Sequence, residues 1–243
     1  MKKKFIKTFT LSCALLMLGG VFAQNEGYAN RRFTSNLFQV DEHIKRQSKD
    51  IDFLDTDSYT GTPYNHPSYL NGNVYQNNEL LATNVALRYN AVADEMEIKE
   101  SLTSPDEEAK VLTKSPEIFV KIMNDIYIFA PYKGGVEGGG YFQVLHEGTT
   151  VDLYKKLKKD FKPERKATSS ITTDTPAMFS DDITYYLATK DGKFYEMPRS
   201  RNKKLKVFGK KKDEVKDFVK DNRLDLNDEK DLLRVVKFYD GIL

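Results

Sequence analysis

The 243-residue sequence has one cysteine, Cys13, and no tryptophan. Cys13 lies in an N-terminal segment that we predict below to be removed, so the mature chain has no thiol. This excludes a disulfide bond, a cysteine nucleophile and a cysteine-ligated metal ion. It also means that packing and hydrogen bonds must supply the stability. The absence of tryptophan leaves no indole platform on which a sugar ring would stack.

Long hydrophobic runs are scarce as well. The apolar run from Phe9 to Leu18 is too short to cross a bilayer as a permanent anchor. A basic, acid-free start at residues 1–7 precedes it, and small residues lead to Ala23. This three-part layout is typical of a secretory signal peptide, so we predict cleavage after Ala23 and export to the periplasm or the outer membrane. The alternative interpretation is an uncleaved N-terminal anchor.

The sequence has no strong excess of charge of either sign. The predicted leader holds four of the 38 basic residues and none of the 36 acidic residues. Removing it therefore leaves 34 basic against 36 acidic residues, a formal charge of −2. A chain with this balance lacks the general basic character of a nucleic-acid-binding protein, and we predict no nucleic acid partner.

From Leu80 onward, the apolar residues follow the two-residue period of β-strands. Asn90–Asp94, Asn124–Asp125 and Glu147–Gly148 interrupt the pattern with turn-forming residues. Asp191–Gly192, between two alternating aromatic runs, is the strongest hairpin signal in the chain. The strands are predicted near residues 85–89, 96–98, 118–122, 126–130, 141–145, 151–157, 183–189 and 193–197.

The period becomes helical near the C-terminus. One predicted helix carries Val215, Phe218 and Val219 on one face, and a second carries Leu232, Val235, Val236 and Tyr239. Acidic and amide residues at 225–228 are suited to cap the second helix. We therefore predict an α+β fold, with a mainly antiparallel β-sheet and two short C-terminal helices from about residue 211. The predicted division is a signal peptide at 1–23, an N-terminal extension at 24–60 and a β-rich domain at 61–243.

Several short runs of residues carry a resemblance to a known group of proteins. The runs are Leu87–Asn90, Asp94–Lys99, Gly140–Phe142, Leu153–Lys156, Gly192–Tyr195, Asp231–Leu233 and Phe238–Tyr239. In these, and in the leader ending Val21–Gln24, the chain resembles uncharacterised exported proteins of the Bacteroidota, from about Gly61 to the C-terminus. The resemblance implies an exported, β-rich protein. It implies no activity and assigns no functional residue.

Motifs for metal, cofactor or nucleophilic chemistry are missing from the sequence. His43, His66 and His146 are far apart, and neither H-E-x-x-H nor G-x-S-x-G occurs. The glycine-rich segment Gly134–Gly140 precedes a predicted strand, whereas a phosphate loop needs a following helix and a Gly-Lys-Ser or Gly-Lys-Thr end. We therefore predict no metal site, no cofactor and no catalytic residue.

Carboxylates cluster in two places and support an alternative function. The two groups are Asp94, Glu95, Glu97 and Glu100, and Asp106, Glu107 and Glu108. Two acids facing each other across a cleft can hydrolyse a glycosidic bond, so the alternative is a periplasmic hydrolase that uses carboxylates. The favoured interpretation is that these acids are solvated on strand faces and in a polar loop.

Two basic runs give the candidate binding site. One contains Lys155, Lys156, Lys158, Lys159, Lys162, Arg165 and Lys166, and the other contains Arg199, Arg201, Lys203, Lys204, Lys206, Lys210, Lys211 and Lys212. From the second run we predict a binding patch at Arg199, Arg201, Lys203 and Lys204, for an anionic envelope component or an acidic protein. The alternative is that these cations only keep edge strands from pairing. The predicted function is a non-catalytic binding or interaction module of the cell envelope.

Overall fold

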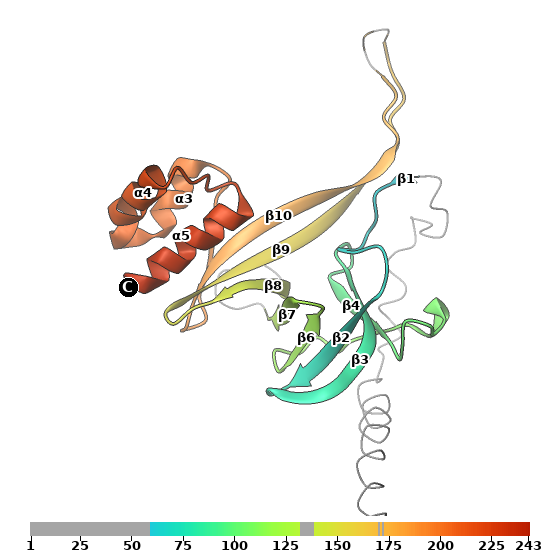
Figure 1. The fold of residues 1–243 in the computed structure, drawn as a ribbon. Helices are drawn as coiled ribbons and strands as arrows, with labels where there is room; N and C mark the ends of the chain where they lie inside the picture. Colours follow the sequence, from blue (N-terminus) through green and yellow to red (C-terminus); the bar gives the residue numbers. More distant parts are fainter. Residues whose placement is uncertain (1–58, 132–138, 170, 172) are drawn as a thin grey trace, which may run out of the picture.

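The computed structural model describes residues 59–131, 139–169, 171 and 173–243 (Figure 1). The predicted signal peptide and most of the predicted N-terminal extension lie outside these residues. The strands are β1 (Tyr59–Thr60), β2 (Leu70–Gln76), β3 (Glu79–Asn90), β4 (Glu95–Lys99), β5 (Lys110–Val111), β6 (Ile118–Ile122), β7 (Asp125–Ala130), β8 (Gly140–Glu147), β9 (Val151–Lys162), β10 (Ala177–Thr189) and β11 (Phe194–Glu196). The helices are α3 (Arg201–Val207), α4 (Lys212–Asp221) and α5 (Glu229–Gly241), with 3-10 turns η2 (Asp106–Glu108) and η3 (Gly209–Lys211).

The described strands form one sheet in the order β1-β10-β9-β8-β7-β6-β2-β3-β4-β5, and β11 also pairs with β10. The prediction of a β-rich α+β fold is confirmed at this level. The sheet is mixed, however, because β1 runs parallel to β10. The Thr60 hydroxyl donates to the Ala177 carbonyl across 117 residues of sequence. No hairpin turn fixes the direction of a strand paired at that distance, so local sequence patterns do not reveal it.

The predicted hairpins are present. β3 pairs with β4, β6 with β7, β8 with β9, and β10 with β11, all antiparallel. Gly192, in the last turn, has a φ of +81°, which explains the Asp-Gly signal. The β9–β10 ribbon is longer than predicted, because β9 continues to Lys162 and β10 begins at Ala177. Figure 1 shows this ribbon running past the rest of the sheet.

The first core lies inside the part of the sheet that curves around on itself, from β8 to β4, and we call this part the curl. Alternate residues of β3, such as Val85, Leu87 and Tyr89, point into it and are almost fully buried. Tyr141 of β8 and Leu157 of β9 pack into the same core. Strands distant in the sheet order therefore share one interior, and the two-residue period identified which residues face it.

Asp94, in the turn between β3 and β4, closes the curl. Its carboxylate accepts hydrogen bonds from the Tyr89 hydroxyl at 2.7 Å and the Tyr141 backbone N–H at 3.1 Å. It also pairs with the buried Lys156 ammonium at 3.1 Å. Burial lowers the pKa of Lys156, and the Asp94 charge opposes that effect. Gly140 leaves room for the pair, since a Cβ there would collide with Asp94 Oδ2 and Lys156 Nζ.

The second core lies between the helices and one end of the sheet. Val151 and Leu153 of β9 pack with Leu232, Val235 and Val236 of α5, and all five are buried. The helical spacing of the apolar residues predicted this face of α5 correctly.

The number and the start of the helices differ from the prediction. The described residues contain three C-terminal α-helices instead of two, and the first begins at Arg201 instead of near residue 211. Leu205 is the only apolar residue that α3 buries, with Lys204 buried beside it and the buried Phe208 just beyond the end of the helix. Two apolar residues within one short turn are too few to give a visible helical period.

Candidate functional site

The helical unit carries the predicted binding residues. α3 begins after Ser200, whose carbonyl accepts hydrogen bonds from the backbone N–H groups of Lys203 and Lys204. Leu205 and Phe208, three residues apart, turn one side of this helix into the second core. The opposite side faces solvent.

Exposed cations are spread along α3 and η3. Residues 199–212 contain eight basic residues and no acidic residue. Arg201, Lys203, Lys206 and Lys210 are exposed, and none of these four makes an ion pair within the part of the chain that the structure describes. We name these four residues the α3–η3 basic surface. With no acid among them, their charges add and favour an anionic partner.

Lys204 does not belong to this surface, which corrects the prediction for that residue. Its side chain is turned inward, and the residue is only 5% exposed. The ammonium donates to the Leu226 carbonyl and to Asn227 Oδ1, both at 2.8 Å. Burial lowers its pKa, with Asp225 opposing the shift. Lys204 therefore connects α3 to the loop before α5. Its position on the buried side of the helix directs its side chain inward, although its neighbours in the sequence are exposed lysines.

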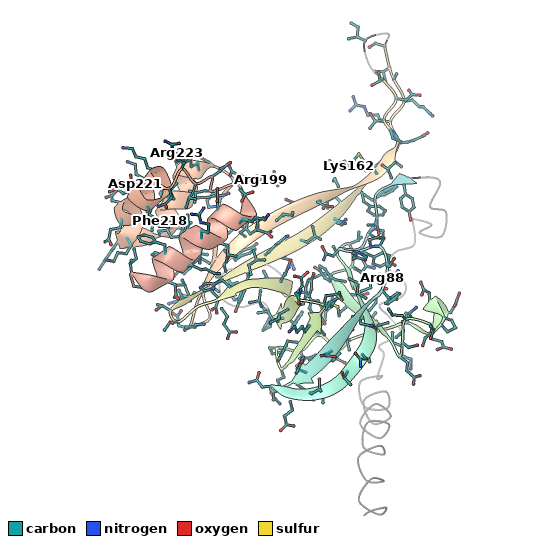
Figure 2. All side chains as sticks on the ribbon, in the orientation of Figure 1. Arg88, Lys162, Arg199, Phe218, Asp221 and Arg223 are labelled. Atoms are coloured by element: carbon teal, nitrogen blue, oxygen red, sulfur yellow. The ribbon has the colours of Figure 1, made fainter. Side chains whose placement is uncertain are left out.

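Arg199 is exposed but already paired. Its guanidinium donates to Asp182 Oδ1 of β10 at 2.6 Å, and its side chain is 88% exposed. Figure 2 shows Arg199 where the helical unit meets β10. Of the predicted patch, Arg201 and Lys203 lie on the basic surface, joined by Lys206 and Lys210 from the same run.

The first basic run is largely neutralised by nearby acids. Its ion pairs are Lys155–Glu229, Lys156–Asp94, Lys159–Asp181 and Lys166–Glu164. Some of these acids come from distant parts of the sequence and one lies within the run itself. The number of basic residues in the first run therefore overstates the positive charge that it presents. The fold leaves the second run as the stronger electrostatic feature.

The acidic cluster is tied to cations on the outer face of β3 and β4. Arg88 pairs with Glu97 at 2.8 Å, and its guanidinium lies over the rings of Tyr64 at 3.6 Å and Tyr69 at 4.0 Å. Lys99 pairs with Asp106 at 2.7 Å. Burial, reinforced by the charge of Glu97, raises the pKa of Tyr64 to about 12. These contacts hold two loops against the strands, as expected of structural ion pairs with stacked rings.

Glu95 is the member of this cluster with the clearest titration shift. Burial raises the pKa of its carboxyl, and Lys114 opposes the shift while Glu97 and Asp94 add to it. A hydrolase would need a second carboxylate facing this acid. The two neighbouring acids are already in ion pairs, because Glu97 pairs with Arg88 and Asp94 pairs with Lys156.

The histidines do not converge. His66 contacts the backbone of Ser68, and His146 Nε2 lies 4.0 Å from Asp240 Oδ2, while His43 lies outside the described residues. No group of three or more histidine, cysteine or acidic side chains in the described residues is arranged to hold a metal ion. Within the same residues, no helix is long and apolar enough to cross a membrane.

The comparisons with known proteins found no match. No family model, no curated protein and no solved structure matched the chain. The functional argument therefore rests on the residues and contacts described above.

Proposed function

We propose that this chain is an exported protein of the cell envelope that acts as a non-catalytic interaction module. It sits in the periplasm or at the outer membrane and binds an anionic envelope component through the α3–η3 basic surface. The observation that carries the proposal is the run of eight basic residues without an acid at 199–212. The leader-like N-terminus, with its basic start and short apolar run, supports the location.

Anionic headgroups fit this surface because they need no shaped pocket. Each lysine or arginine near an anionic membrane surface contributes about 1 kcal/mol at moderate salt, and the effect is screened within about a Debye length. Lys203, Lys206 and Lys210 recur along the solvent side of α3 and η3 and can contact one surface together. An acidic protein is the alternative partner for the same charges.

Vesicle binding tests the proposal. The protein should sediment with vesicles containing phosphatidylglycerol and not with phosphatidylcholine alone, and added salt should release it. The triple variant Lys203→Gln, Lys206→Gln, Lys210→Gln should bind more weakly by about five-fold per lysine.

The matched control removes the same charge from the other helices. Lys216→Gln, Lys220→Gln, Lys237→Gln changes three exposed lysines on α4 and α5. It should bind more tightly than the α3–η3 variant. Equal losses in the two triple variants, or binding that ignores both salt and lipid charge, would contradict the proposal.

The hydrolase alternative stays a prediction. The pairing of Glu97, Asp94 and Asp106 with cations gives it no support. An assay for glycan hydrolysis by the purified protein would test it separately.

A further inference from the structure

Within the described part of the chain, the outer edge of β10 is paired at its two ends and unpaired between them. β1 pairs with β10 at Ala177 and Met178, and β11 pairs with it from Tyr186 to Ala188. The Met197 N–H extends the second pairing by donating to the Tyr185 carbonyl at 2.8 Å. Residues 180–184 lie between these two contacts, and we call them the β10 slot.

The slot presents unused backbone groups. The Met197 bond to Tyr185 and the Thr189 bond to Lys193 show that odd-numbered residues of β10 direct their backbone away from β9. Asp181 and Ile183 therefore turn their N–H and C=O groups outward, and in the described part of the chain these groups have no hydrogen-bond partner. Ile183 is also 38% exposed. Unpaired edge groups of this kind are a template for an added strand.

The ends of the slot limit what can fill it. At one end, Gly61 has a φ of +84°, which turns the chain away from β10 after β1. At the other end, Pro198 follows Met197 and has no N–H to continue the pairing. A long strand, such as the 13-residue β10 of a second copy, would run into β1 and β11, which lie in the same row. Only a segment of about five residues, with ends that turn away, fits an opening of this length.

The charge of the slot specifies the middle residue of such a segment. Asp182 lies at its centre, and among the residues that the structure describes its side chain bonds to Arg199, whose side chain is 88% exposed. An ion pair this exposed is weak and exchanges readily with solvent or another cation. A residue opposite Asp182 on an added strand would sit close to the carboxylate, where a basic side chain is favoured.

We infer that the β10 slot binds a short extended segment of a partner protein as an additional strand, with a lysine or arginine opposite Asp182. This site is separate from the α3–η3 basic surface and does not depend on the proposed function.

Nuclear magnetic resonance with the peptide acetyl-Thr-Val-Lys-Val-Thr-amide tests the inference. In ¹⁵N-labelled protein, the amide signals of Asp181 and Ile183 should shift on titration, and their hydrogen exchange should slow. A peptide with Glu in place of Lys should bind about two- to five-fold more weakly. Methylating the two valine nitrogens of the peptide should abolish binding to the unaltered protein.

A pair of variants controls for the fold. Ile183→Pro removes an outward N–H while leaving the β9 ladder intact, so it should fold and lose the peptide at least ten-fold, whereas Ile183→Thr should bind as the natural chain does. Three results would overturn the inference: slow exchange of the Ile183 amide without peptide, unchanged Asp181 and Ile183 signals at millimolar peptide, or equal binding of the N-methylated peptide.

Discussion

Single residues decide how the curl of the sheet closes. Asp94 receives one hydrogen bond from the nearby Tyr89, and it receives a hydrogen bond from Tyr141 and an ion pair from Lys156, which lie 47 and 62 residues away in the sequence. Breaking a buried ion pair by displacing one partner is costly, because the other charge stays buried without compensation. Gly140 is therefore as important to this contact as the charged residues themselves.

Replacing Gly140 tests that argument. Gly140→Ala should destabilise the protein by about 3 kcal/mol, since the new Cβ displaces the Asp94–Lys156 pair and the φ of +128° disfavours any side chain. Urea unfolding at neutral pH measures the change.

Gly192→Ala is the matched control. Gly192 also has a positive φ, of +81°, but a Cβ there meets nothing within 4 Å. It should lose only about 1–2 kcal/mol from backbone strain. Equal losses at the two positions would show that the collision at Gly140 contributes nothing.

At the scale of elements, Asp240 fixes α5 to the sheet. Its carboxylate accepts the backbone N–H groups of Thr149, Thr150 and Val151, at 2.8, 2.7 and 2.9 Å, in the turn between β8 and β9. Burial alone would raise its pKa, but these three donors together with His146 outweigh that effect and lower it. The helix is thus attached by its last turn as well as by its apolar face.

The lowered pKa predicts how stability depends on pH. The stabilisation from Asp240 is fully present above the pKa of an unfolded aspartate, near 3.9, and is lost as the pH falls through the lowered folded value. Asp240→Asn should cost about 1–2 kcal/mol at neutral pH and flatten the loss of stability in acid. Urea unfolding measured from pH 7 down to pH 3 checks this.

Asp221→Asn serves as the control for this series, because it makes the same charge change on the exposed surface of α4. An Asp240→Asn profile that runs parallel to that of the natural chain would contradict the prediction.

At the scale of the whole molecule, one sheet serves two cores. β9 contributes Leu157 to the core inside the curl and Val151 and Leu153 to the core under the helices. A strand shared in this way couples the two ends of the protein. The α3–η3 basic surface therefore rests on a helical unit that is packed against the sheet, and Figure 1 shows that unit on the opposite side of the ribbon from the curl.

The proposed export makes a prediction for the intact protein. Protein recovered from the cell envelope should begin at Gln24, and its mass should lack residues 1–23. It should also fail to react with thiol reagents, because Cys13 leaves with the leader. Intact-mass analysis decides this, and Met1 still attached to protein recovered from the cytosol would contradict export.

The sequence by itself determined the hairpins, the inward faces of the strands and the apolar face of α5. These features depend on residues close together in the chain, such as Asp191–Gly192 in a turn or Val235 and Val236 on one helix face. Turn geometry and side-chain periodicity are local properties, so a pattern of types and spacings is enough to reveal them.

Only the tertiary structure decided the parallel pairing of β1 and the closing of the curl by Asp94. It also decided which lysines are exposed and which are bonded to other groups. Lys203 and Lys204 are neighbours of the same type, yet one faces solvent and the other bonds to the loop before α5. Whether a charge is free or paired depends on groups brought together from far along the chain, and no local pattern encodes those distances. The sequence therefore revealed a run rich in basic residues, and the fold determined which of those residues form the basic surface.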